Sequence, residues 1–209
     1  MNYLDSGPVA ADAPLLLLAH GAGAPMDSEF MHNMAELLAG LGVCLRRFEF
    51  PYMQQRRLTG SWRPPDKQEV LLQCWRDVIH DVNLRDRHKL VIGGKSMGGR
   101  MASLLADEQQ VAGLVCLGYP FHPAGKPEQL RTAHLYELTT PTLIVQGSRD
   151  ALGSREEVAA YELSTHIECL WLEDGDHDLK PRLKSGYTHA QHLQAAAEAI
   201  AGFMLRVGC

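Results

Sequence analysis

The sequence predicts an α/β fold in which a mostly parallel sheet of about six or seven strands carries helices on both faces. Short apolar runs alternate along the chain with longer stretches in which apolar residues recur at helical spacing. Nearly every short run is continuously apolar, as expected of parallel strands that are buried on both faces. Neither an internal repeat nor a low-complexity tract interrupts this alternation, so residues 1–209 are predicted to form a single domain.

The six apolar runs are predicted to be the strands of this sheet. They are LLLLAH at 15–20, VCLRRFEF at 43–50, KLVIGG at 89–94, VAGLVCLGY at 111–119, TLIVQG at 142–147 and IECLWLE at 167–173. In open parallel sheets, ligands bind beyond the carboxyl ends of the strands. The polar residues that directly follow each run are therefore the candidates for chemistry.

The stretches between these runs predict helices and one long loop. Apolar residues three or four positions apart predict helices over 30–41, 71–82, 97–105 and 193–203. The segment PYMQQRRLTGSWRPPD at 51–66 is rich in proline and arginine, and it is predicted to be a long loop rather than a domain boundary.

Composition and charge exclude several classes of protein. The formal net charge is −5, which argues against a nucleic acid partner because phosphate binding draws on clustered Lys and Arg. The run PLLLLAH is too short to span a bilayer, and acidic Asp5 and Asp12 precede it rather than the basic residues of a signal peptide. The five cysteines are scattered without a CxxC pair. We therefore expect a cytoplasmic location, no membrane partner and no disulfide framework.

The segment IGGKSMGGR at 92–100 contains both Gly-Lys-Ser and Gly-x-Ser-x-Gly, which point to different chemistry. A phosphate-binding loop needs the pattern G-x-x-x-x-G-K-[ST], and Lys89 occupies the position of its first glycine. A dinucleotide-binding G-x-G-x-x-G also fails, because Gly21 and Gly23 are followed by Met26 at the last glycine position. The sequence therefore does not support phosphate binding here.

The same segment satisfies the requirements of a nucleophilic serine on a sharp strand-to-helix turn. Such a turn needs very small residues two positions before and two positions after the serine, and Gly94 and Gly98 supply them around Ser96. Ser96 would lie at a helix N-terminus, where backbone N–H groups favour developing negative charge. The alternative is that Ser96 only caps the helix.

A serine needs a base, and that base needs a carboxylate to orient it. In this architecture the partners follow in the order serine, acid, histidine, each after a strand. TLIVQG leads into Asp150, and IECLWLE leads into His177, so both order and placement agree. The alternatives are that Asp150 caps a helix starting near Ser154 and that His177 is an ordinary surface residue. The aspartates around His177, at 174, 176 and 178, are too close in sequence to orient its ring.

An oxyanion formed at Ser96 would need hydrogen-bond donors. The backbone N–H of Met97, the residue after the serine, is one candidate, and that of Ala22 in the turn AHGAG is the other. The alternative is that AHGAG is only a glycine-rich turn.

Together, AHGAG, GGKSMGGR, TLIVQGSRD and DGDHD resemble the α/β-hydrolase superfamily. GYPFHPAGKPEQLR, which follows a predicted strand, resembles a compact group known as dienelactone hydrolase-like or alpha/beta-hydrolase-11. That group includes the hydrolase-like subunit of the non-specific lethal chromatin complex. The resemblance implies an α/β-hydrolase fold with Ser96, Asp150 and His177 as catalytic triad. Dienelactone hydrolases carry a cysteine nucleophile, so Ser96 departs from them, and some relatives serve as interaction modules.

The segment between Tyr119 and Pro141 is too short for the lid domain that many enzymes of this fold carry. An open site without a large lid favours small or exposed acyl groups. The residues expected to contact substrate are His20, Tyr119, His122 and Arg57. One hypothesis is that the loop with Tyr119 and His122 and the basic loop 56–63, with Arg56, Arg57 and Arg63, favour an acyl or leaving group that carries negative charge. The alternative is a solvated basic loop.

These observations predict a serine hydrolase that cleaves a carboxylic ester or a related acyl bond through an acyl-enzyme on Ser96. Its partner is a small-molecule acyl substrate, and neither a metal nor a cofactor is expected. Two alternatives stay open: a catalytically idle interaction module on the same fold, and a thioesterase or peptidase. The oligomeric state is not predicted.

Overall fold

A seven-stranded sheet forms the centre of the computed structural model, which describes residues 2–8, 13–82 and 90–208. The spatial order of the strands is β1-β3-β2-β4-β5-β6-β7. β1 runs antiparallel to β3, and all other neighbouring strands are parallel. The strands are β1 (Tyr3–Ser6), β2 (Leu15–Ala19), β3 (Cys44–Phe48), β4 (Leu90–Lys95), β5 (Gly113–Leu117), β6 (Thr142–Gly147) and β7 (Ile167–Leu172).

All six predicted strands are present, and the fold class is confirmed. β1 was not predicted, because its four residues at the sheet edge are only partly buried and carry no apolar run. Lys89, the predicted first residue of β4, lies outside the described residues. Between β5 and β6 the chain forms only the four-residue helix α6 (Ala133–Tyr136), so this connection holds no lid domain.

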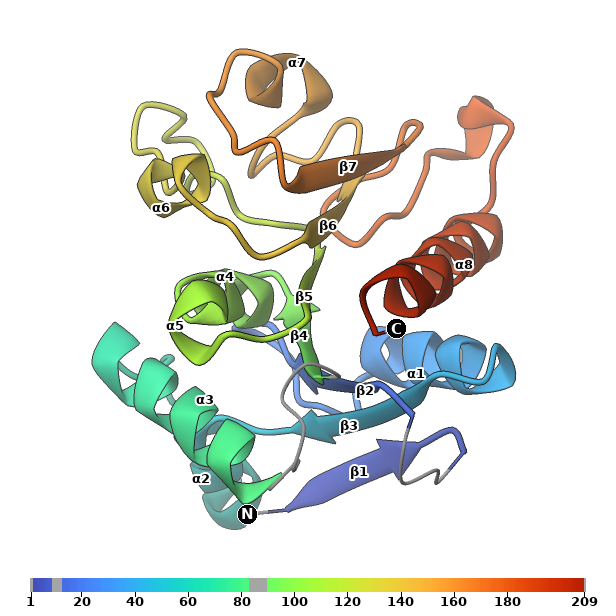
Figure 1. Ribbon diagram of the computed structural model, residues 1–209. Coiled ribbons are helices and arrows are strands. Elements are labelled where there is room, and N and C mark those ends of the chain that lie inside the picture. The colour runs from blue at the N-terminus through green and yellow to red at the C-terminus, as the bar shows by residue number, and fades with distance from the viewer. Residues whose placement is uncertain (1, 9–12, 83–89, 209) are drawn as a thin grey trace.

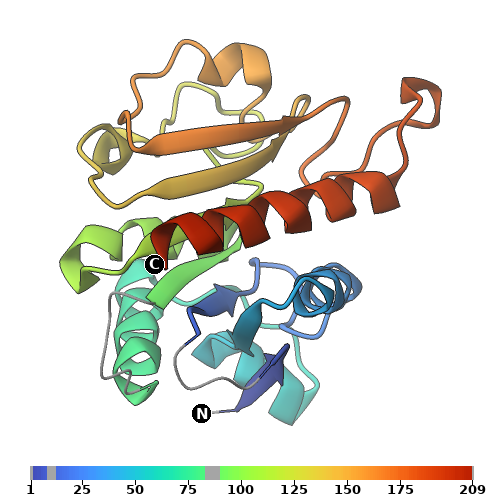
Figure 2. The ribbon, with the colours of Figure 1, turned by 45° about the vertical axis from the view of Figure 1, so that its right-hand side comes forward.

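The helices cover both faces of the sheet, as Figures 1 and 2 show. They are α1 (Glu29–Gly40), α2 (Pro51–Thr59), α3 (Gln68–Asp81), α4 (Met97–Ser103), α5 (Ala106–Gln109), α7 (Arg155–Val158) and α8 (His189–Val207), with a 3₁₀ turn η2 (Leu183–Ser185). The four predicted helices correspond to α1, α3, α4 and α8. In Figure 1, α1 and α8 lie together on one face of the sheet, whereas α3, α4 and α5 lie on the other.

The prediction of a continuous loop over 51–66 is wrong, because its first part is the helix α2. Pro51 occupies the first helical turn, where its fixed φ favours a helix and its missing N–H costs no hydrogen bond. Tyr52 and Met53 are buried, so tertiary packing stabilises a segment that the proline and arginine content marked as loop. Only the part that follows α2 is irregular.

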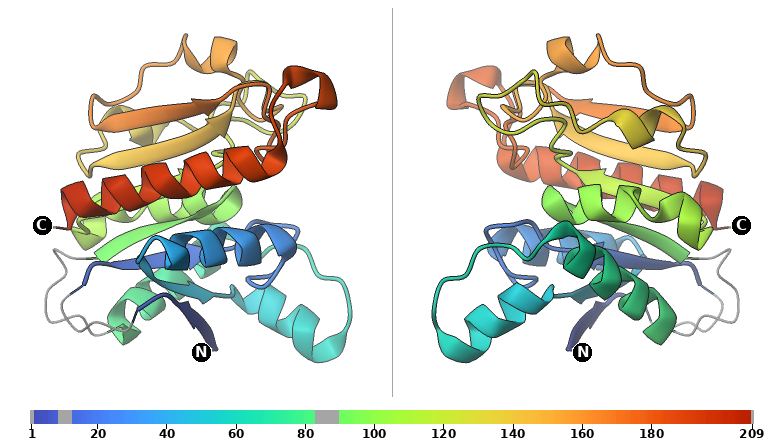
Figure 3. Two further views of the ribbon diagram at one scale, coloured as in Figure 1. Left: turned by 90° about the vertical axis from the view of Figure 1, so that its right-hand side faces the viewer. Right: turned by 90° about the vertical axis from the view of Figure 1, so that its left-hand side faces the viewer.

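Two hydrophobic layers explain why the strands are continuously apolar. Leu17 packs into the layer under α3 and α4 with Trp75 and Met101. Its neighbours Leu16 and Leu18 point the other way, into the layer under α1 and α8. Because successive side chains of a strand alternate between faces, a strand covered on both sides is apolar at most of its positions. The segments that follow β3 and β7 project from the same end of the sheet (Figure 3).

Trp75 provides a test of this packing. Its side chain is fully buried, and its ring centroid lies 4.6 Å from that of Phe48. We expect Trp75→Ala to lower the free energy of unfolding by about 3–5 kcal/mol, because it leaves a cavity that the sheet cannot close. Trp62, which is 76% exposed, is the matched control. Trp62→Ala should change stability by less than about 0.5 kcal/mol. Urea denaturation measures both, and equal losses would contradict the assignment of the core.

Candidate active site

The turn between β4 and α4 holds Ser96 in an uncommon backbone conformation. Ser96 has φ 51° and ψ −116°, which a residue with a side chain adopts only when its surroundings enforce it. A Cβ on Gly94 would lie 2.6 Å from the carbonyl oxygen of Ala19, and a Cβ on Gly98 would lie 2.6 Å from those of Ala19 and His20. Neither position has room for a side chain. The turn is therefore packed directly against the end of β2.

Ser96, His177 and Asp150 form one chain of hydrogen bonds. His177 Nε2 lies 2.8 Å from Ser96 Oγ, and His177 Nδ1 lies 2.8 Å from Asp150 Oδ2. The Asp150 carboxylate is fully buried, and it can only accept, so Nδ1 carries the proton that it receives. Nε2 of the neutral ring then accepts the hydroxyl proton of Ser96. The geometry is that of a serine next to an oriented base.

Asp150 is held by further hydrogen bonds from its own loop and strand. The backbone N–H of Leu152 donates to Oδ1 at 2.8 Å, and the Gln146 side chain donates to Oδ2 at 2.9 Å. Asp150 does not cap α7, because Ser154 does so with Glu157 in a capping box. The carboxylate is therefore fully hydrogen-bonded toward His177 and its own loop, which offsets the cost of burying its charge.

The aspartates on either side of His177 bind groups other than its ring, as their spacing predicts. Asp174 pairs with Arg182 and Arg149. Asp176 accepts the backbone N–H groups of Asp178 and Lys180, each at 2.9 Å. These bonds order the loop in which His177 lies.

A pocket of about 380 Å³ opens beside Ser96. Its lining comprises the glycine-rich turn after β2, the start of α1 and the Ser96 and His177 segments: Gly21, Ala22, Gly23, Ala24, Ser28, Phe30, Met31, Lys95, Ser96, His177 and Asp178. A Cβ on Gly21 would lie 3.6 Å from the Ser96 Cβ, so this turn lies directly against the serine. Met97 begins α4, and its N–H therefore has no carbonyl partner inside the helix.

Two buried side chains hold the turn that contains Ala22. The Phe50 N–H donates to His20 Nε2 at 3.1 Å, so His20 Nδ1 carries a proton and donates to the Gly21 carbonyl at 2.6 Å. The Tyr52 hydroxyl lies 3.3 Å from the same carbonyl and 3.0 Å from that of Ala22. Burial lowers the pKa of His20, which keeps this ring neutral. In a planar trans peptide the N–H points opposite to the C=O. Fixing the Gly21 carbonyl toward His20 therefore turns the Ala22 N–H to the other side.

The prediction that His20 contacts substrate is wrong, because the ring is fully buried behind the turn that it supports. The same correction applies to Tyr119 and His122. Tyr119 is fully buried, and its hydroxyl donates to the Arg131 carbonyl. His122 is 2% exposed, and its Nδ1 lies 2.9 Å from the Pro123 carbonyl. Neither side chain belongs to the pocket lining.

Arg57 is also placed away from the pocket. Its guanidinium binds Glu49 at 2.5 Å and Asp27 at 2.8 Å, and these bonds raise its pKa. With two carboxylates on one guanidinium, little charge is available for a substrate anion. Arg57 connects α2 to Glu49 and to the segment before α1, so this residue lends no support to the hypothesis that the basic loop 56–63 selects anionic groups.

Three residues of the site were not among the predicted site residues. Gln146 and Tyr52 position Asp150 and the Gly21 turn, and Lys95 lines the pocket. Gln146 is fully buried at the end of β6, and Lys95 is 7% exposed at the end of β4. Gln146 and Lys95 could have been found in the sequence as long polar side chains inside otherwise apolar strands, since such groups need a buried partner.

A second serine–histidine pair lies under α4. Ser103 Oγ is 2.8 Å from His134 Nε2, but the Ser103 hydroxyl donates to the Arg100 carbonyl at 2.8 Å. The histidine must therefore donate to the serine, which is the reverse of a base. Ser103 is also only 2% exposed. This pair connects α4 to α6 and carries no catalysis.

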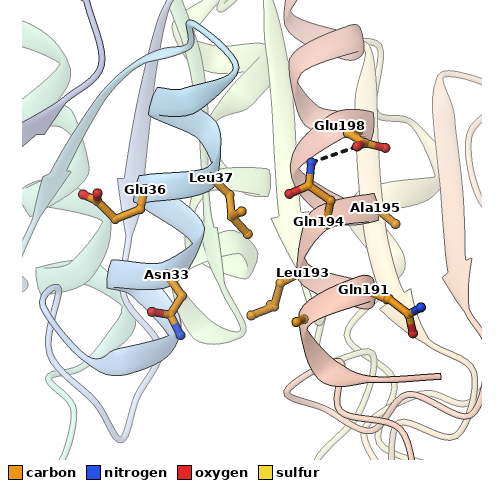
Figure 4. Close-up of a pocket in the computed structure, with 9 residues that line it drawn as sticks. Asn33, Glu36, Leu37, Gln191, Leu193, Gln194, Ala195 and Glu198 are labelled. Carbon is orange, nitrogen blue, oxygen red and sulfur yellow. Dashed lines mark hydrogen bonds between the residues drawn. The ribbon is translucent and has the colours of Figure 1, made fainter.

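Other features of the described residues point to no further chemistry. No group of three or more His, Cys, Asp or Glu is placed there to hold a metal ion, and none of the helices there could cross a membrane. A larger hollow of about 680 Å³ lies between α1 and α8. In Figure 4, Leu37 and Leu193 lie between Glu36 and Glu198. Its lining includes no residue of the triad and no serine, cysteine or histidine.

Comparisons with known proteins agree with this fold. The sequence model of a family described as "Alpha/beta hydrolase domain" matches residues 12–205. Est1E from Butyrivibrio proteoclasticus, solved with ferulic acid, shares 18% identity at a TM-score of 0.70, with 99% of this chain and 94% of that chain covered. A lidless α/β serine hydrolase from Xanthomonas campestris shares 18% sequence identity at a TM-score of 0.68, with 98% of this chain and 87% of that chain covered. Dienelactone hydrolase from Anabaena variabilis shares 20% sequence identity at a TM-score of 0.65, with 93% of this chain and 87% of that chain covered.

His134 makes stability depend on pH. Burial, with a smaller effect of Arg100, lowers its pKa from 6.5 to about 4. As pH falls, the unfolded chain binds this proton first, so stability is lost between about pH 6.5 and pH 4. Because the ring is partly exposed, we expect a loss of about 1–2 kcal/mol rather than the full value of the shift.

Denaturant titrations at pH 7 and pH 4 measure this loss in wild type and in His134→Gln, whose amide can still donate to Ser103. The variant should lose less stability on acidification by that amount. His32→Gln, at an exposed position of α1, is the control for removing a histidine. An unchanged pH dependence in His134→Gln would refute the assignment.

Proposed function

The chain belongs to the alpha/beta hydrolase domain family, and on that premise we propose that it is a serine hydrolase that cleaves a carboxylic ester. The observation that carries the proposal is the hydrogen-bond chain from Ser96 through His177 to buried Asp150, with both distances at 2.8 Å. A pocket opens on Ser96 at the same point. Nucleophile, base and orienting carboxylate thus lie next to a space that an acyl group can enter.

In the proposed mechanism, Ser96 Oγ attacks the ester carbonyl while His177 Nε2 takes the hydroxyl proton. Asp150 stabilises the imidazolium that forms. The tetrahedral intermediate then collapses, its C–O bond to the alcohol breaks, and the imidazolium gives its proton to the leaving oxygen. Water attacks the acyl-enzyme by the same proton route in reverse, which releases the acid and restores Ser96.

The backbone N–H groups of Met97 and Ala22 are the proposed donors to the oxyanion. Removing one such donor typically slows an enzyme by about 10²–10³. The bonds from His20 and Tyr52 to the Gly21 turn support this role, because they fix the orientation of the Ala22 peptide before substrate binds. Donors that are already oriented need no rearrangement during the reaction.

We propose that the acyl group is small and uncharged. Ala22, Ala24, Phe30 and Met31 give the pocket an apolar wall. The charged side chains of its lining, Lys95 and Asp178, pair with each other at 3.1 Å. The pocket therefore offers no free charge for a substrate carboxylate, and 380 Å³ suits a short chain or one ring.

Labelling with a fluorophosphonate probe tests the nucleophile. We expect the wild-type protein to be labelled at one site, and Ser96→Ala to lose both the label and ester hydrolysis, the latter by about 10³-fold or more. Ser103→Ala is the matched control, because Ser103 also lies 2.8 Å from a histidine nitrogen. It should be labelled as wild type is. Failure of the folded wild-type protein to react would favour a catalytically idle interaction module.

A substrate panel tests the acyl group and the leaving group. We expect nitrophenyl acetate and butyrate to be hydrolysed with a kcat/KM at least about tenfold above that of the succinate half-ester, because an unpaired carboxylate would be desolvated in the pocket. Matched thioesters and amides, and a hydroxycinnamate ester, complete the panel. A preference for the succinate half-ester that disappears in Arg57→Gln would restore the basic-loop hypothesis instead.

A further inference from the structure

Lys95 is a buried lysine directly before the nucleophile. It is the last residue of β4, and its side chain is 9% exposed in the wall of the pocket. Nζ donates to the main-chain carbonyl of His177 at 2.6 Å and binds Asp178 Oδ1 at 3.1 Å. The ring centroid of Phe30 lies 5.3 Å from Nζ. The carbonyl, the carboxylate and the ring are all groups that favour a cation.

These contacts connect two elements that the sheet keeps apart. Ser96 follows β4, whereas His177 follows β7, and β5 and β6 lie between these strands. The hydrogen bond between Ser96 Oγ and His177 Nε2 joins the two segments through their side chains. Lys95 adds a hydrogen bond from the end of β4 to the backbone of the histidine segment. This bond therefore connects the segment of the nucleophile to the segment of the base.

Gly118, just after β5, leaves the space through which this contact is made. It has φ +65°, and a Cβ there would lie 2.7 Å from the His177 carbonyl oxygen and 3.2 Å from Lys95 Nζ. β5 is thus followed by a residue with no side chain at the point where the Lys95 ammonium meets the His177 carbonyl. The approach is a built feature of three segments and not a chance contact of one long side chain.

We propose that Lys95 is a positioning residue: its ammonium holds the His177 main chain so that the imidazole lies between Ser96 and Asp150. The inference rests on the proposed function and goes beyond it by giving the base a support outside the triad. We do not assign Lys95 a role as a substrate-binding cation, because its charge is paired with Asp178 and a second donor is bound to the His177 carbonyl. General-base catalysis needs the base within hydrogen-bond reach of the proton, so a displaced His177 slows the reaction without weakening substrate binding.

Lys95→Met tests the inference, because methionine has a similar length and lacks both the charge and the donors. We expect kcat for nitrophenyl acetate to fall by about 10–100-fold, while KM changes less than about threefold, since a displacement of about 1 Å costs about 10². The label from a fluorophosphonate should still reach one per chain, but more slowly. Lys126→Met, at an exposed position, should match wild type.

Two further measurements separate positioning from a general loss of structure. The proton on His177 Nδ1, shared with Asp150, should give a downfield NMR signal in wild type that broadens or disappears in Lys95→Met. Lys95→Cys treated with 2-bromoethylamine regains an ammonium of nearly lysine length, because the thiolate displaces bromide and forms a thioether. This treatment should restore kcat and the NMR signal, and wild type treated in the same way controls for the other thiols.

The outcomes are distinct. Wild-type kcat and NMR signal in Lys95→Met would overturn the inference, as would a loss confined to KM, or a folded Lys95→Cys protein that alkylation does not rescue. A wild-type protein that neither labels nor hydrolyses any ester would refute the proposed function. In that case the NMR comparison still reports whether Lys95 holds His177.

Discussion

The close packing of the Ser96 turn against the end of β2 is the constraint on which the site depends. Gly94 and Gly98 lie so near the Ala19 carbonyl that a methyl group on either would overlap it. The chain can therefore turn from β4 into α4 in very little space, with Ser96 at φ 51° on the outside of the bend. The turn that carries Ala22 begins only one residue after Ala19. One contact thus sets the positions of the serine and of the neighbouring glycine-rich turn together.

The rest of the site is built from buried polar groups whose partners come from other segments. Gln146 at the end of β6 donates to Asp150 and accepts the Tyr119 N–H, and His20 after β2 bridges the Phe50 N–H and the Gly21 carbonyl. A buried polar group without a partner costs free energy, so each such bond disfavours any other course of the loop it holds. The loops at this end of the sheet are ordered by these bonds as well as by apolar packing.

The sequence alone predicts most strands and helices of the fold, but it does not predict the directions in which several side chains point. Six strands and the helices α1, α3, α4 and α8 follow from apolar spacing, because burial on both faces or on one helical face leaves a periodic record. β1 left none, since an edge strand of four residues buries little. Ser96, Asp150 and His177 could be predicted to lie together because parallel strands bring their carboxyl ends to one edge. His20, Tyr119, His122 and Arg57 share that edge, but each turns into the interior or toward a carboxylate, and nothing local in the sequence records that turn.

Two serine–histidine pairs in the described part of the chain show why distance alone does not identify a nucleophile. Ser96 and Ser103 each lie 2.8 Å from a histidine Nε2. At Ser103 the hydroxyl proton is already directed to the Arg100 carbonyl, so His134 must donate and cannot take a proton from it. At Ser96 the buried Asp150 carboxylate requires the proton on His177 Nδ1, which leaves Nε2 free to accept. Whether a serine–histidine contact is structural or a candidate for catalysis is therefore decided by the further hydrogen bonds of the serine and the histidine. For Ser96 the deciding group is the Asp150 carboxylate, which Gln146 and the Leu152 N–H hold in place.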